Sequence, residues 1–194
     1  MSRIIGCQQL HIAEVTKDDL SGATFGVPVA VPAVIGVDIT DNSENVTFYS
    51  DDVVEQVIPA FSGKEVTIEL GYLSHEIESM ISGNTYENGV FIQNANATAK
   101  EYALLFRAPL SKGGFQYVCL YKGVLSRTEA NYKSKEDSIE GQTVTLNGVF
   151  MPLQYNGNVA IKANSTDEGA QETIATWFTE VPLVAKPSMS RKAK

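Results

Sequence analysis

The chain has 194 residues, of which 43% are hydrophobic and 20% charged, a composition typical of a folded globular protein and not of a disordered one. No apolar run reaches the roughly 18 residues that a membrane-spanning helix needs, so we expect no membrane insertion. The formal net charge is −8, and this excess of acids argues against a groove that grips nucleic-acid phosphates.

The charge is unevenly distributed along the chain. The last nine residues carry four basic side chains and no acid, which leaves 23 acidic and 11 basic side chains, a net charge of −12, in the rest. We expect a single domain over residues 1–184 and a flexible basic tail over 185–194. Cys7 and Cys119 lie in strand-like runs of a chain without a recognisable signal peptide, so we expect free thiols and a cytosolic product.

The first 40 residues predict strands. Residues 3–15 alternate weakly, and residues 35–40 alternate well between apolar and small or polar side chains. Between them, Pro28 and Pro32 exclude a central position in a sheet because proline cannot donate a ladder hydrogen bond. Residues 25–32 are therefore expected to form an edge strand or an extended connector.

Residues 41–63 show no periodic pattern, and we expect a long extended loop there. The segment combines apolar and aromatic side chains with several acids. A loop of this length is uncommon in a compact domain unless it has a function. Its apolar content indicates that it packs against something, either its own domain or another chain.

The next stretch predicts a strand followed by a short helix. Residues 64–70 alternate cleanly, as a half-buried strand requires. Ser74 can cap a helix that places Ile77 and Ile81 on one face, and Gly83 can end that helix in the left-handed conformation.

Two apolar strands, 101–108 and 115–126, are joined by a predicted hairpin at 111–114, where two glycines permit a tight turn. Both strands are apolar on both sides. Such strands are either central to a sandwich or buried by a second subunit.

The last part of the chain predicts two more strands and a helix. Residues 142–151 alternate well, and residues 158–163 form a short strand. A helix that starts at Thr166 or Asp167 carries an apolar stripe, with Trp177 expected in the core. The stripe consists of Ile174, Trp177, Phe178 and Val181. The inventory predicts a mainly β protein, an antiparallel sandwich or barrel with a short helix packed on it.

Catalytic motifs are not recognisable. His11 and His75 have no metal-ligand or triad spacing, and there is no phosphate-binding loop and no nucleophile elbow. The acidic pairs 51–52 and 136–137 are best explained as turn or rim acids. We therefore expect no enzyme, no metal and no cofactor.

Four runs in the chain resemble the major tail proteins, or tail tube proteins, of long-tailed, non-contractile bacteriophages. They are FYSDD (48–52), KEYALLF (100–106), SKEDSIEGQTVTL (134–146) and IATWF (174–178). The resemblance covers residues 3–184 in order, including the placement of both short helices.

This resemblance implies a subunit of the phage tail in the virion, made in the host cytoplasm. It implies hexameric rings that stack into a hollow tube around a tape-measure protein, with baseplate and tail-terminator proteins as partners at the tube ends. DNA would pass through the tube without specific binding, and an acidic lumen would repel it weakly.

Two sets of residues become assembly candidates on this basis. The polar face of the strand at 142–151 is a candidate for the lumen lining, with ordinary solvent exposure as the alternative; it carries Thr143, Thr145 and Asn147. The apolar and acidic segment 41–63 is a candidate for contacts between subunits or rings; the residues are Phe48, Tyr49, Asp51, Asp52, Val53, Val54 and Phe61.

Two other interpretations stay open at this point. A tube protein of a contractile or type VI-like secretion system would share the architecture. A carbohydrate-binding sandwich would also be β-rich and acidic, and would need exposed aromatic side chains on one face.

Overall fold

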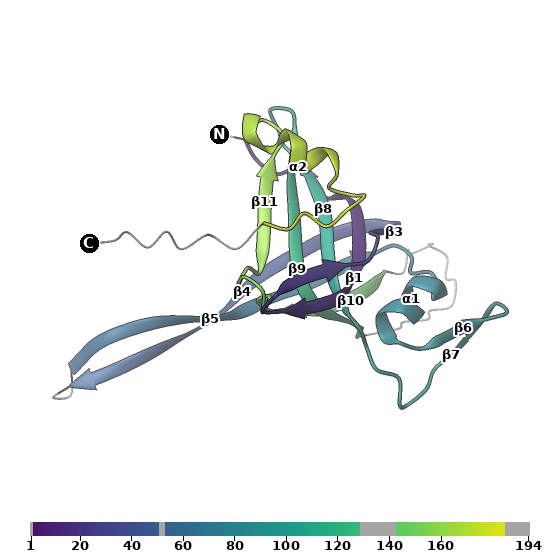
Figure 1. Cartoon of the computed structure of the whole chain (residues 1–194), viewed down its shortest axis with the longest axis horizontal. Helices are drawn as coiled ribbons and strands as arrows, with labels where there is room; N and C mark the ends of the chain where they lie inside the picture. Colours follow the sequence, from purple (N-terminus) through teal and green to yellow (C-terminus); the bar gives the residue numbers. More distant parts are fainter. Residues whose placement is uncertain (1, 51–52, 129–142, 185–194) are drawn as a thin grey trace, which may run out of the picture. The chain divides into compact units, whose positions relative to one another are not determined.

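A computed structural model describes residues 2–50, 53–128 and 143–184, and these residues form a mainly β structure (Figure 1). The strands are β1 (Gln8–Asp19), β2 (Gly22–Phe25), β3 (Val29–Val31), β4 (Val34–Ser50), β5 (Val53–Leu70), β6 (Thr85–Glu87), β7 (Val90–Ile92), β8 (Glu101–Pro109), β9 (Phe115–Arg127), β10 (Val144–Phe150) and β11 (Ala160–Asn164). The helices are α1 (His75–Ser82), the 3-10 turn η1 (Glu168–Ala170) and α2 (Gln171–Ala175).

Nine of these strands form one antiparallel sheet in the order β2-β1-β8-β9-β10-β5-β4, with β3 added on β1 and β11 added on β9. Strands β6 and β7 form a separate hairpin. The prediction of a mainly β, antiparallel fold is confirmed. Because the two ends of this order, β2 and β4, do not pair with each other, the described strands do not close into a barrel.

The chain divides into two compact units. The first comprises Met1–Val31, Glu101–Lys122 and Pro152–Lys194, and the second comprises Pro32–Lys100 and Gly123–Met151. Strand β9 contributes residues to both. The single domain over residues 1–184 stays a prediction.

In the first unit, the predicted β8–β9 hairpin is confirmed, with Gly113 and Gly114 at positive φ of 92° and 82°. Both strands are buried on both faces by the chain itself. One face packs on Leu153, Trp177 and Val181 of the C-terminal segment. Of the two explanations for the two-sided apolar pattern, burial within the fold therefore accounts for it, and no neighbouring subunit is needed.

The C-terminal helix of the first unit is shorter than its apolar stripe. Asp167 precedes η1, and α2 ends at Ala175, so the second half of the stripe lies beyond the helix. Trp177 is nevertheless fully buried, with its ring 5.6 Å from that of Tyr117. The core position predicted for Trp177 is confirmed, while the helix that was expected to carry it there is not.

A buried ion pair ties three segments of the first unit together. The Asp18 carboxylate in β1 accepts a hydrogen bond from Lys122 Nζ in β9 at 3.0 Å. It also accepts hydrogen bonds from the backbone N–H groups of Gln154 and Tyr155, at 3.0 and 3.2 Å. The side chain of Asp18 is only 2% exposed, so these three donors replace its lost hydration.

In the second unit, the helix prediction is confirmed in detail. The hydroxyl of Ser74 accepts a hydrogen bond from the Ile77 N–H, which caps α1. Ile77 and Ile81 are buried, and Gly83 ends the helix at a φ of 70°. The helix packs beside the β6–β7 hairpin.

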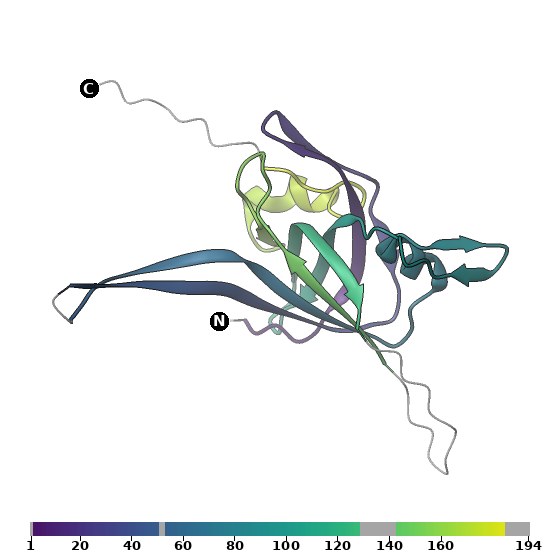
Figure 2. The same ribbon diagram turned by 90° about the horizontal axis from the view of Figure 1, so that it is seen from below.

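The expected loop at 41–63 is wrong, because its described residues belong to strands β4 and β5. These strands pair from Val34 opposite Leu70 to Ser50 opposite Val53, and Figures 1 and 2 show them side by side along their length. Within β5, only residues 64–70 pair with β10. The outer half of the hairpin therefore pairs with no other described strand. The local pattern did not predict these strands because residues 41–63 lack the apolar alternation by which a half-buried strand is recognised.

Candidate assembly surfaces

The sheet of the second unit presents one exposed polar face, which we call the acidic face. In antiparallel pairs, residues directly opposite each other point to the same side of the sheet. The register places Thr145 beside Glu69, Asn147 beside Thr67, and Thr67 beside Asp38. The acidic face consists of Asp38, Thr40, Glu65, Thr67, Glu69, Ser126, Thr128, Thr145, Asn147 and Val149.

A row of hydrogen bonds centred on Asn147 holds the middle of this face. The Thr67 hydroxyl donates to Asn147 Oδ1 at 3.2 Å, and Asn147 Nδ2 donates to the Thr128 hydroxyl at 2.7 Å. The row thus crosses from β5 over β10 to the end of β9. Polar side chains that bond to each other across strands hold one another in place.

The electrostatics of the acidic face have one sign. Asp38, Glu65 and Glu69 contribute carboxylates, and no lysine or arginine belongs to the face among the residues that the structure describes. The nearest basic residue in β5 is Lys64, which precedes Glu65 and forms an ion pair with Asp41, directly opposite it in β4. Because neighbouring residues of a strand alternate between the two sides of the sheet, Lys64 lies on the side away from the acidic face. The described residues of this surface therefore offer the phosphates of a polyanion no lysine or arginine side chain.

The predicted lumen residues come together on this face. Thr145 and Asn147 lie within it, half-buried, and Thr143 is exposed just before β10 begins. Glu65, Thr67 and Glu69 were not among the predicted lumen residues, although the alternation of residues 64–70 predicted a strand, in which Val66, Ile68 and Leu70 are buried. What was lacking was the pairing of β5 with β10, which no local pattern reveals.

The second candidate surface is the outer half of the β4–β5 hairpin, which we call the hairpin arm. Val53 is 67% exposed and Phe61 is 46% exposed, as are large apolar side chains elsewhere in the chain, such as Val27 at 77%. The Lys64 ammonium lies 5.6 Å from the centre of the Phe61 ring, a weak cation–π contact.

For the other predicted contact residues, the structure gives the position in the strands or no description. Phe48 and Tyr49 belong to β4, and Val54 belongs to β5. Asp51 and Asp52, between the two strands, lie outside the described residues. The described members of this set thus belong to strands β4 and β5 of one hairpin.

Within residues 2–50, 53–128 and 143–184, no group of three or more His, Cys, Asp or Glu side chains is placed to hold a metal ion. In the same ranges, no helix is long and apolar enough to cross a membrane. No protein-family model matches the chain, and no curated protein is significantly similar to it.

Proposed function

We propose that the protein is the structural subunit of a bacteriophage tail tube, which forms rings that stack into a hollow conduit for the genome. The observation that carries the proposal is the acidic face, a sheet surface with carboxylates, hydroxyls, one amide and the exposed Val149 but no described lysine or arginine. The sequence resemblance to tail tube proteins suggests where this face would lie, namely around the central hole of a stacked tube.

In the proposed tube, copies of the acidic face surround the central hole. DNA has one negative charge for about every 1.7 Å of its axis. Each contact between a lysine or arginine side chain and a phosphate adds affinity, and this affinity falls as the salt concentration rises. A lumen that offers such contacts would retain the genome. A lumen of carboxylates and hydroxyls keeps DNA in the solvent at the centre and lets it slide.

The hairpin arm supplies the contact between copies in this proposal. Among the described strands, its two edges pair with no third strand, and it carries exposed apolar side chains at Val53 and Phe61. Unpaired strand edges with apolar side chains favour pairing with another chain. We place the stacking contact there, with the tape-measure protein inside the tube and the terminator and baseplate proteins at its ends.

The proposal is tested by a charge substitution on the hairpin arm. Val53→Asp places a carboxylate where the proposed contact is apolar, and an unpaired carboxylate is costly to bury. Sedimentation velocity of the wild type should show large assemblies as concentration rises, and Val53→Asp should need at least about tenfold more protein to assemble. The folded subunit should be unaffected, because Val53 is 67% exposed in it.

The matched control is Val27→Asp, the same change at a valine that is 77% exposed in the first unit and does not belong to the hairpin arm. This variant should assemble like the wild type. Assembly of Val53→Asp at wild-type concentration would remove the hairpin arm from the proposed interface.

A further inference from the structure

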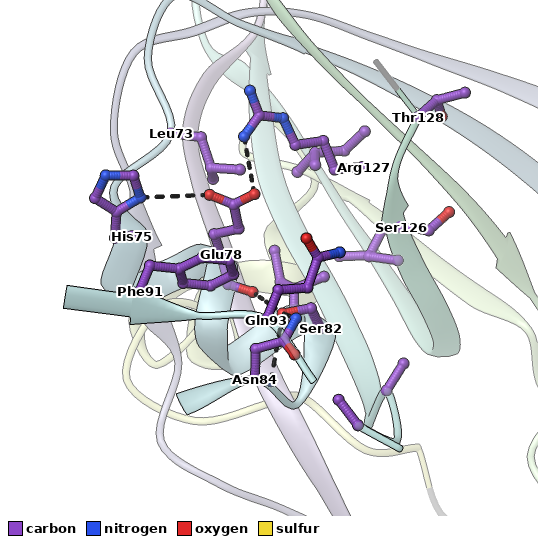
Figure 3. A pocket seen from close by; sticks show the side chains of 15 residues that line it. Leu73, His75, Glu78, Ser82, Asn84, Phe91, Gln93, Ser126, Arg127 and Thr128 are labelled. Atoms are coloured by element: carbon purple, nitrogen blue, oxygen red, sulfur yellow. Dashed lines mark hydrogen bonds and ion pairs between the residues drawn. The ribbon is translucent and has the colours of Figure 1, made fainter. Parts of the chain in front are cut away.

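The second unit contains a pocket of about 550 Å³ (Figure 3). Its floor is apolar and well packed, formed by the buried side chains of Leu73, Ile81, Leu125 and Leu146. Its size lies within the range of about 300–1,000 Å³ that is usual for small-molecule sites. Leu146 and Arg127 are opposite each other in the register and point to the side of the sheet away from the acidic face, while Ser126 and Thr128 of the acidic face also line the pocket.

Charged and polar side chains converge over this floor. Figure 3 shows the Glu78 carboxylate between Arg127 and His75, with Gln93 pointing into the same hollow. Arg127 Nη1 lies 2.8 Å from Glu78 Oε1, and His75 Nδ1 lies 3.5 Å from Glu78 Oε2. The side chains of Glu78 and Arg127 are only 13% and 24% exposed. A largely buried carboxylate and guanidinium at this distance form a strong, oriented pair.

The ion pair determines which net charge the pocket prefers. Because the two opposite charges lie together, a charged ligand attracted by one partner is repelled by the other. A ligand without net charge avoids this conflict and can still bond to both groups, since the carboxylate only accepts hydrogen bonds and the guanidinium only donates them. The pocket therefore favours a neutral ligand that carries donors and acceptors side by side.

An aromatic wall adds a further requirement. The ring of Phe91 lines the pocket and is stacked with the His75 imidazole, at 5.8 Å between centroids and 25° between planes. Together with the apolar floor, this wall needs a ligand with a non-polar face. The ligand must thus combine a C–H surface on one side with a rim of groups that both donate and accept.

We propose that this pocket binds a neutral saccharide. Neighbouring hydroxyls of a sugar ring lie about a hydrogen-bond length apart, and each can donate and accept at once. One hydroxyl can donate to Glu78 while the next accepts from Arg127, and a third can bond to the Gln93 amide. The C–H face of the ring packs against Phe91. Sugar binding here would be a function beyond tube assembly, at a site that shares Ser126 and Thr128 with the acidic face.

The test uses the full-length protein and the methyl glycosides of glucose, galactose, mannose and N-acetylglucosamine. Binding is measured by saturation-transfer and ¹H–¹⁵N NMR titration. We expect at least one of these neutral sugars to bind and to shift the backbone signals of Leu73, Phe91 and Arg127. Glucuronate and glucosamine, which carry a charge, should bind more weakly than their neutral counterparts.

Substitutions locate the site and separate binding from folding. Glu78→Gln keeps the shape of the side chain but disrupts the ion pair, and Gln93→Ala removes only an exposed amide; each should weaken binding about tenfold or more. Glu65→Gln, the same charge change on the acidic face, should bind like the wild type. Unchanged thermal unfolding of Gln93→Ala excludes misfolding as the cause of its loss.

Three outcomes would overturn the proposal. The first is that none of the four glycosides shifts the pocket signals. The second is that a charged sugar binds more tightly than its neutral counterpart, or that both pocket variants bind like the wild type. The third is that N-acetyl-leucine amide, a peptide fragment with an apolar side chain, binds in the pocket while all sugars fail, which would assign the pocket to a peptide segment.

Discussion

Replacing Asp18 by asparagine should destabilise the protein by about 3 kcal/mol, because it breaks a buried ion pair while leaving the partner in place. The new side-chain carbonyl could still accept from the N–H of Gln154 or Tyr155, but the amide N–H₂ would then be turned toward other donors. Lys122 would keep a second partner in Glu101, at 3.5 Å, which places the cost at the low end of the usual range of about 3–5 kcal/mol for breaking such pairs.

Thermal unfolding followed by circular dichroism measures this cost. For a chain of this length, about 3 kcal/mol corresponds to a fall in melting temperature of roughly 6–12 °C. Glu69→Gln, a matched change of one charge on an exposed strand position, should shift the melting temperature by no more than about 2 °C. A melting temperature for Asp18→Asn equal to that of Glu69→Gln would refute the stabilising role of the buried pair.

The same pair predicts a pH dependence. Burial by itself would raise the pKa of Asp18, but the hydrogen bonds from Gln154, Lys122 and Tyr155 outweigh burial and hold the pKa below its ordinary value. A lowered pKa in the folded state adds stability above the unfolded pKa of about 3.9, and this contribution is lost as the pH falls through the folded value. The difference between wild type and Asp18→Asn should therefore be constant from about pH 7 to about pH 5 and shrink below about pH 4. A difference that grows on acidification would contradict the assignment.

Two further substitutions test the packing of the sheet and the charge of the acidic face. Gly123→Ala would place a Cβ 2.6 Å from the Phe150 ring and should lower the free energy of unfolding, measured by chemical denaturation, by about 1–3 kcal/mol. The control Gly36→Ala meets nothing within 4 Å and should not lower it by this amount. Equal effects of the two substitutions would show that the Gly123–Phe150 contact is loose. Glu65→Lys combined with Glu69→Lys should give the protein a salt-sensitive affinity for duplex DNA in a filter-binding assay, while the wild type binds none. Wild-type binding at moderate salt would contradict the role given to the acidic face.

Elements with a complete local signal could be predicted from the sequence. The α1 helix has its serine cap, its apolar pair and its glycine stop within one short stretch, from Ser74 to Gly83. The β8–β9 hairpin likewise depends on two glycines between apolar runs. Nothing outside these segments was needed to predict them.

Features that depend on distant residues or on exposure could not be predicted in the same way. The outer half of the β4–β5 hairpin lacks the apolar alternation that marks most strands. The acidic face depends on the register between β5 and β10, which lie far apart in the chain. The pocket depends on the meeting of Glu78 and Arg127, and neither residue stands out in the sequence.

Electron microscopy of the purified protein tests the central claim most directly, which is that identical copies surround a central hole. Samples should be imaged by negative staining at rising concentration, with and without the tail-tip complex as a template. The proposal predicts rings or tubes with a stain-filled centre. A protein that stays single under all these conditions would contradict it.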